Sequence, residues 1–480
     1  MSDELSLLDA TAQAELVRTG KLSAAELVEA AIARLSRLNP SLNAVIHPAL
    51  ERARQRAQSP SLAAGPLRGV PFLMKDIGGA EAGEPCHCGM RFLKDAGWRE
   101  SQDSYLTQRF VAAGLISLGR TNTPELALLP TTEPEAYGAT HNPWQLGFSS
   151  GGSSGGAAAA VAAGIVPAAH ASDGGGSIRG PASACGLVGL KPSRGRNSFG
   201  PGLGERWSGF SAEFALTRSV RDTALLLDLT AGPMPGDPYW APPPARPYAQ
   251  EVGAPTGHLR IGLMRRGPRD VQVHPECVVA VDKTARVLES LGHRVELAHP
   301  PALDEAQSIA VYAGVVATNV ARALEAWGEK VGRAVTRADV ELLTWALAEL
   351  GRQASGTQLL GMIEYVHGFG RRLAAFWQGG FDLLLTPTMG ALPAALGELS
   401  STPEEPLRAL LRAAPYGAFT LPFNLSGQPA ISLPAHVTPD GLPVGTQLVA
   451  AAGREDLLLR VASQLELAAP WAQRLPPHHA

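Results

Sequence analysis

The sequence predicts an α/β protein whose mixed, mostly parallel sheet is flanked by helices. Segments typical of helices and of strands alternate along most of the 480 residues, and this alternation is typical of such sheets. The strand expected at 67–74 is almost continuously apolar, as strands buried on both faces are. Hydrophobic residues make up 45% of the chain, which is enough for a large core.

Local signals define the elements that precede residue 150. Ser23 and Glu26 form a capping box, which predicts the start of a helix. That helix is expected to end before Asn39-Pro40, because proline disfavours the helical conformation of the residue before it. Two amphipathic helices therefore precede the first strand. The elements expected next are strand 67–74, helix 104–113 and strand 115–118.

The same alternation returns after residue 215. Strands are expected at 260–264, 294–297, 383–385, 430–433 and 445–450, and helices at 219–230, 277–291 and 455–466. Residues from about 303 to 377 are expected to be helical throughout. The proline-rich connection at 232–247 resembles a linker, but the later strands favour a return to the same sheet.

The most informative stretch of the chain is 151–181, which reads GGSSGGAAAAVAAGIVPAAHASDGGGSIRGP. The alanine run 157–163 predicts a helix, and Gly164 can end it. Residues 166–171 then form an expected strand, and a second helix is expected to open at Ser177. Two serines thus lie in glycine-rich loops on either side of a small-residue helix and a buried strand.

The second glycine-rich loop has the features of an oxyanion site. Gly174, Gly175 and Gly176 lack a Cβ, so their backbone N–H groups can converge on one point. The N–H of Ser177 would join them, and a helix start behind the loop would add partial positive charge. Ser177 therefore stands where a nucleophile would be needed.

This combination resembles the amidase signature family of serine hydrolases. The resemblance rests on the pattern GGSSGG…DGGGSIRGP, in which Ser177 follows Ser153 by 24 residues, and on GVPFLMKD, which supplies Lys75. Further matches are GLVGLKP at 186–192 and PFNLSGQPA at 422–430. Within the family, TTEP, NPW, SDGGGS and KPSRGR are similar to the bacterial amidases that include the 6-aminohexanoate cyclic-dimer hydrolases.

The resemblance implies one large α/β/α domain over residues 1–480 with a many-stranded sheet. Its signature core would cover about 65–200, and residues of about 300–380 would form a helical insertion over the active site. It also implies hydrolysis of a small-molecule amide without any cofactor or metal. A homodimer is compatible with it.

The family's catalytic roles transfer to three residues of this chain. Ser177 would attack the amide carbonyl, Ser153 would relay its proton, and Lys75 would be the base. Gly174, Gly175, Gly176 and Ser177 would supply the oxyanion hole. The family also places a cis peptide before the relay serine. Lys75 must then be neutral, so its pKa must fall from about 10.4 towards 7, which burial can cause.

Several residues admit other interpretations. Lys191 is a rival lysine that we expect to be structural, and Asp173 with Arg179 is expected to form an ion pair that shapes the loop. Cys86-His87-Cys88 lacks a second ligand pair, so we expect no metal there. Position 174 is glycine where many family members carry threonine or another side chain, and this difference is expected to loosen the oxyanion loop or enlarge the pocket beside it.

Three other functions are compatible with parts of the sequence. An α/β-hydrolase would use Ser153 within GGSSG together with His436, but no hydrophobic strand precedes that serine. A phosphate-binding module would need the P-loop pattern, which is absent. The glutamine-amidase subunit of a transfer-RNA amidotransferase shares the family fold. Co-purifying partners and glutaminase activity would distinguish it from a free-standing amidase.

Composition limits the partners. The net charge of −3 and the pI of about 6.5 favour neither nucleic acid nor an anionic membrane. The four cysteines are too few for a disulfide framework, and the acidic N-terminus does not resemble a signal peptide. The apolar segment 309–324 contains polar residues and is expected to be a core helix. We therefore expect a cytoplasmic protein.

Overall fold

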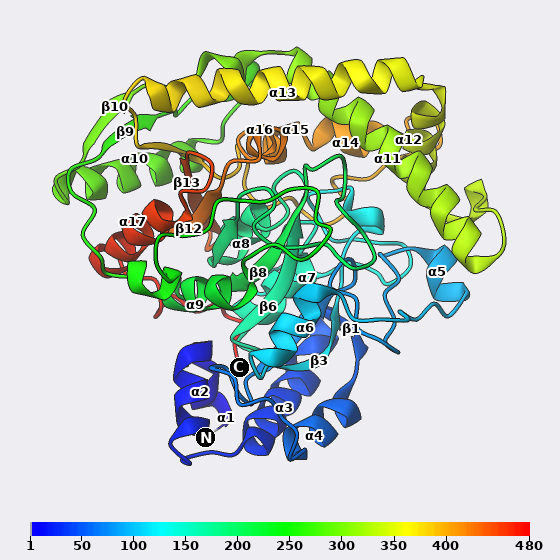
Figure 1. The fold of residues 1–480 in the computed structure, drawn as a ribbon, viewed down its shortest axis with the longest axis vertical. Helices are drawn as coiled ribbons and strands as arrows, with labels where there is room; N and C mark the ends of the chain where they lie inside the picture. Colours follow the sequence, from blue (N-terminus) through cyan, green and yellow to red (C-terminus); the bar gives the residue numbers. More distant parts are fainter. Residues whose placement is uncertain (1) are drawn as a thin grey trace.

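The fold is centred on a sheet of eight strands. The computed structural model describes residues 2–480, with side chains from residue 4 onward. In spatial order the strands are β10 (Arg294–Leu297), β9 (Arg260–Leu263), β11 (Leu383–Pro387), β13 (Pro443–Ala450), β12 (Ala430–Val437), β7 (Val188–Lys191), β8 (Ala212–Thr217) and β6 (Ala168–Asp173). Strands far apart in sequence are therefore neighbours in the sheet, for example β7 and β12 (Figure 1).

The mixed, helix-flanked sheet is confirmed, but its strands are not mostly parallel. Among the described strands of this sheet, only β10 with β9 and β9 with β11 run parallel. The other neighbouring pairs are antiparallel. The expectation failed because β7 and β8 were not recognised as strands, and because β12 and β13 form a hairpin rather than a helix-linked pair.

A smaller sheet carries the lysine-bearing segment. It consists of β1 (Val45–Pro48), β3 (Ile116–Thr121) and β2 (Pro71–Lys75), with β2 and β3 parallel and β1 antiparallel to β3. All five residues of β2 are buried, as its apolar sequence predicts. β2 packs beside β6, so the two sheets meet where Lys75 and the second glycine-rich loop lie. A short hairpin pairs β4 (His141–Asn142) with β5 (Gln145–Ser149).

Helices cover both faces of the large sheet. α8 (Arg179–Cys185) contacts β7, β12 and β13 on one face and packs against α7 (Gly155–Ala162). The other face is covered by α9 (Val220–Thr230), α10 (Pro275–Ser290) and α17 (Glu455–Ala468), and α17 contacts both α9 and α10. Every residue of α7 is buried, because its alanines and glycines let neighbouring elements approach closely.

Three helices lie along the top and the upper right side of the molecule in Figure 1. They are α11 (Gln307–Val331), α12 (Leu342–Gln353) and α13 (Gly356–Gln378), where the sequence predicts helix. α11 is long and apolar enough to span a membrane by length and composition. Its buried residues, Val315 and Val320 among them, instead pack against α12 and α13, as in a core helix.

The N-terminal region differs in two details from the expectation. Its helices are α1 (Ser2–Ser6), α2 (Ala10–Arg18), α3 (Ala24–Leu42) and α4 (Leu50–Gln58). The capping box of Ser23 and Glu26 is confirmed. α3 nevertheless continues through Pro40 and ends at Leu42, and the following C-cap residue, Asn43, adopts a left-handed conformation with φ of 49°. β1 and α4 then precede the strand that was expected to be the first.

The remaining helices are short connections. They are α5 (Arg91–Asp95), α6 (Tyr105–Ala112), α14 (Arg408–Arg412), α15 (Ala414–Gly417) and α16 (Leu421–Ser426), with 3-10 turns η1 (Glu125–Ala127), η2 (Tyr248–Glu251), η3 (Pro268–Asp270), η4 (Pro301–Asp304) and η5 (Arg337–Asp339). α6 and α9 begin after Ser104 and Ser219, as predicted. The four cysteines are buried and unbridged.

Candidate active site

Lys75 ends β2 and is fixed from both sides of its backbone. Its N–H donates to Nδ1 of His170 at 3.2 Å, and its carbonyl oxygen accepts from the Arg120 guanidinium at 2.7 Å. The side chain is fully buried. Because β2 packs beside β6, the amine is held against residues of the first glycine-rich loop and of β6.

Three serine hydroxyls surround the Lys75 amine. Nζ lies 2.7 Å from Oγ of Ser153, 2.9 Å from Oγ of Ser154 and 2.9 Å from Oγ of Ser172. Ser154 and Ser172 were not expected from the sequence. Strand periodicity places Ser172 on the same face of β6 as His170, but only the packing of β6 beside β2 shows that this face meets Lys75.

Burial lowers the pKa of Lys75 to about 7. The positive charge of Arg206 lowers this pKa further, whereas the carboxylates of Asp173 and Glu213 oppose the change. Taking an ammonium out of water disfavours its charged form. Near neutral pH, a large fraction of this lysine is therefore the free amine that a base requires.

The hydrogen bonds around Ser154 indicate which serine can give a proton to Lys75. Ser154 Oγ donates to the carbonyl oxygen of Ser172 at 3.2 Å, so its own proton is committed. It also accepts from the Ser172 N–H at 3.3 Å. A neutral amine has two N–H donors and one lone pair. Donation to Ser154 and Ser172 leaves the lone pair for the hydroxyl of Ser153.

The peptide bond between Gly152 and Ser153 is cis, as the family resemblance implies. The carbonyl oxygen of Ser153 accepts a hydrogen bond from the Thr123 hydroxyl at 2.9 Å. Ser153 is fully buried, and α7 begins two residues later at Gly155. Backbone and side chain of this serine are thus both held in place.

Asp173 and Arg179 form the expected ion pair, and it shapes the second loop. The carboxylate of Asp173 lies 2.9 Å from the Arg179 guanidinium, and both side chains are fully buried. The same carboxylate accepts from the N–H groups of Gly176 at 2.7 Å and Ile178 at 3.1 Å. Asn424 adds a further donor at 2.9 Å. The charge of Arg179 and these hydrogen bonds hold the pKa of Asp173 well below its ordinary range, against the effect of burial.

Two details of the expected oxyanion site change as a result. The Gly176 N–H, one of the four expected donors, is directed at Asp173. The helix behind the loop begins at Arg179 rather than Ser177 and has only seven residues. In the described part of the chain, the N–H groups of Gly174, Gly175 and Ser177 have no protein acceptor, so these three are the ones that can face an oxyanion.

Large aromatic side chains cover two of the three glycines. A Cβ at Gly174 would lie 2.7 Å from the Trp207 ring, and one at Gly175 would lie 2.5 Å from the Tyr312 hydroxyl. That hydroxyl donates to the Gly174 carbonyl at 3.2 Å. The space beside Gly174 is therefore filled by Trp207 and not added to a pocket, contrary to one of the two expectations. Ser177 itself is partly exposed.

Two histidines belong to the alternative interpretations, His436 to the α/β-hydrolase and His87 to the metal site. His436 is bonded to Lys283 and Glu276, so it does not complete a triad with Ser153 and the α/β-hydrolase alternative fails. His87 is bonded to the Tyr137 hydroxyl and to the Trp98 carbonyl.

Comparison with known proteins agrees with this geometry. The Amidase family model matches residues 26–459. The 6-aminohexanoate-cyclic-dimer hydrolase of Paenarthrobacter ureafaciens is 45% identical over 476 residues, covering 98% of this chain and 96% of that protein. A solved 6-aminohexanoate cyclic dimer hydrolase gives a TM-score of 0.95 at 44% identity, covering 98% of this chain and 99% of that one. The chain belongs to the amidase family.

A more distant relative represents the amidotransferase alternative. The solved structure of a glutamyl-tRNA(Gln) amidotransferase chain from Thermotoga maritima gives a TM-score of 0.80 at 25% identity, covering 99% of both chains. The chain is 44% identical to the solved cyclic-dimer hydrolase and 25% identical to the amidotransferase chain. This difference in sequence identity favours the hydrolase branch of the family. The protein is an amidase, a hydrolase that acts on carbon–nitrogen bonds other than peptide bonds.

Proposed function

We propose that this amidase hydrolyses small linear or cyclic amides of ω-amino acids through an acyl-enzyme on Ser177. The family supports the reaction class, and the 45% identity to a 6-aminohexanoate-cyclic-dimer hydrolase supports the substrate class. The proposed catalytic residues are Lys75 as base, Ser153 as relay and Ser177 as nucleophile.

In the acylation half-reaction, Ser177 Oγ forms a bond to the amide carbonyl carbon. Its proton passes to Ser153, whose own proton passes to the lone pair of Lys75. The carbonyl oxygen becomes an oxyanion that the N–H groups of Gly174, Gly175 and Ser177 stabilise. As the tetrahedral intermediate collapses, the carbon–nitrogen bond breaks and the proton returns through Ser153 to the leaving amine.

In the deacylation half-reaction, water attacks the ester on Ser177. Its proton takes the same route to Lys75 and then returns through Ser153 to the Oγ of Ser177, as the second tetrahedral intermediate collapses to a carboxylic acid and the free serine. Lys75 thus alternates between amine and ammonium, so a pKa near neutral suits both steps.

The single observation that supports this proposal most strongly is the environment of the Lys75 amine. It is fully buried, has a pKa lowered to about 7 and lies 2.7 Å from Ser153 Oγ. A general base must be within hydrogen-bond reach of the proton it takes and must be neutral at the working pH. Lys75 meets both conditions through its surroundings.

A hydrolysis screen tests the proposal. Purified protein is assayed on 6-aminohexanoate cyclic dimer, linear 6-aminohexanoate oligomers, simple primary amides, anilides, esters and glutamine, with Ser177→Ala as the matched control. We expect the highest kcat/KM on ω-amino-acid amides and none in the control. Preference for glutamine, with a co-purifying partner, would instead support the amidotransferase alternative.

A further inference from the structure

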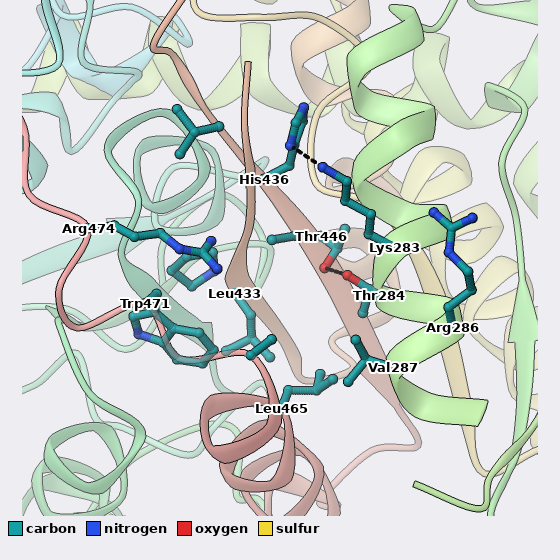
Figure 2. Close-up of a pocket in the computed structure, with 14 residues that line it drawn as sticks. Lys283, Thr284, Arg286, Val287, Leu433, His436, Thr446, Leu465, Trp471 and Arg474 are labelled. Atoms are coloured by element: carbon teal, nitrogen blue, oxygen red, sulfur yellow. Dashed lines mark hydrogen bonds between the residues drawn. The ribbon is translucent and has the colours of Figure 1, made fainter. Parts of the chain in front are cut away.

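A large cavity is lined by residues that are not part of the candidate active site. It has a volume of about 660 Å³ and lies between α10 and the C-terminal segment, over β12 and β13 (Figure 2). Volumes of roughly 300–1,000 Å³ are typical of small-molecule sites. None of its described lining residues belongs to the group around Lys75 and Ser177.

Consecutive residues of β13 show that this cavity and the active site lie on opposite faces of the sheet. The Thr446 hydroxyl lies 3.1 Å from that of Thr284 on α10 and faces the cavity. The next residue, Gln447, accepts from Arg179 at 2.7 Å. Because successive side chains of a strand point to opposite faces, a ligand in the cavity does not reach the catalytic serines.

The floor of the cavity is apolar. Leu433 on β12 and Leu465 on α17 are buried, and Trp471 is only 5% exposed. Val287 of α10 also lines the cavity. Figure 2 shows these side chains grouped at the lower end of the cavity, below the charged ones. Such a surface suits an aliphatic chain, whose burial is favourable by about 25 cal/mol per Å².

The rim of the cavity is cationic, and none of its described lining residues is acidic. Its charged lining residues are Lys283, Arg286 and Arg474. In the part of the chain that the structure describes, the guanidinium groups of Arg286 and Arg474 form no ion pair or hydrogen bond. In Figure 2 the Arg474 side chain reaches over Trp471 and Leu433 towards the centre of the cavity.

His436 fixes the position of Lys283. The Lys283 ammonium donates to Nδ1 of His436 at 2.8 Å, and Nε2 of the same ring donates to the Glu276 carboxylate. The ammonium retains two further N–H donors. Lys283 and Arg474 therefore stand on opposite sides of the cavity, one supported by its neighbours and the other unpaired among the described residues.

We propose that this cavity binds an amphipathic monocarboxylate with an unbranched aliphatic chain. The carboxylate would lie between Arg474 and Lys283, and the chain would lie on Leu433, Leu465 and Trp471. A free ω-amino acid fits poorly, because its ammonium would face the same cations without an acidic partner. This proposal is independent of the activity assigned to Ser177.

Decanoate is a suitable probe, and isothermal titration calorimetry on the full-length protein measures its binding. We expect one saturable site per chain, about tenfold weaker in Arg474→Ala and in Lys283→Ala, because a charge-assisted hydrogen bond is lost. Arg371→Ala is the matched control, since Arg371 is an exposed arginine on α13 without an ion pair among the described residues. It should bind decanoate like the wild type.

Two comparisons make the test decisive. Decylamine should not bind, and Arg474→Lys should restore most of the affinity that Arg474→Ala loses. Amide hydrolysis by Arg474→Ala should equal that of the wild type, which separates this site from the catalytic one. The proposal is wrong if decanoate shows no saturable binding, if decylamine binds equally well, or if Arg474→Ala and Arg371→Ala have the same affinity.

Discussion

Two buried lysines of this protein look alike by charge and burial but differ in their surroundings. Lys75 and Lys191 are both almost fully buried, and burial lowers the pKa of each to about 7. Lys75 lies among the hydroxyls of three serines. The Lys191 ammonium donates instead to the carbonyl oxygen of Pro192 at 2.8 Å.

The difference shows that a lowered pKa does not by itself make a lysine a catalytic base. A base also needs a proton-bearing group within hydrogen-bond reach. Ser153 offers such a group to Lys75, whereas a carbonyl oxygen has no proton to give to Lys191. We therefore assign the chemistry to the first lysine and a structural role to the second.

The largest expected effect comes from removing the base or the nucleophile. Lys75→Ala and Ser177→Ala should each lower kcat/KM by about 10⁴–10⁶-fold, because catalytic residues that act together lose most of their activity when one of them is removed. Ser153→Ala should leave a small residual rate. Steady-state assays with matched circular dichroism spectra check this.

Lys191→Met serves as the matched control for that experiment. It removes the other buried amine of lowered pKa while nearly conserving volume, so kcat/KM should stay within about tenfold of the wild type. Loss of activity in Lys191→Met equal to that in Lys75→Ala would remove the distinction between the two lysines.

Gly174→Ala should lower kcat/KM by about 10²-fold, an effect expected when a reacting group moves by about 1 Å. The added methyl would lie 2.7 Å from the Trp207 ring, so the loop or the ring must move. Trp207→Ala removes that contact, and the double variant should recover activity relative to Gly174→Ala. A double variant no better than Gly174→Ala would contradict this cause.

The pH dependence should follow the pKa of Lys75. Its neutral form is the active one, and burial lowers the pKa to about 7, so kcat/KM should fall about tenfold per pH unit below 7 and level off above it. A pH–rate profile of the wild type measures this. An unchanged rate down to about pH 5 would exclude a lysine base of this pKa.

Ser172→Ala should have the smallest effect, about tenfold on kcat, because the Lys75 amine loses one acceptor at 2.9 Å and with it a hydrogen bond of about 1 kcal/mol. As a positioning residue, Ser172 should also shift the midpoint of the pH–rate profile when replaced. A lower rate with an unchanged midpoint would indicate only a structural role.

The candidate site could be predicted from the sequence because its residues lie in short, distinctive segments. Lys75 ends an apolar strand, and Ser153 and Ser177 stand in glycine-rich loops, so local pattern suffices. Ser172, a further hydroxyl at the Lys75 amine, was missed because its contact depends on how β6 packs beside β2, which no local pattern contains.

The errors in the fold have a similar origin. β8 was missed because Glu213 interrupts its apolar pattern, yet that side chain is buried beside His170. Pro40 was expected to end a helix that in fact continues to Leu42. The helix start at Ser177 was placed two residues early, because the Ile178 N–H is bonded to the Asp173 carboxylate. For β8, a tertiary contact overrides the local preference.

The most direct test of the central claim is to identify the serine that becomes acylated. The protein is treated with a fluorophosphonate or a slow amide substrate, digested and examined by tandem mass spectrometry. We expect an adduct on Ser177 in the wild type and none in Lys75→Ala, because the N–H groups of Gly174, Gly175 and Ser177 have no acceptor among the described residues and can face the oxyanion that this serine would create. An adduct on Ser153 would contradict the assignment of relay and nucleophile.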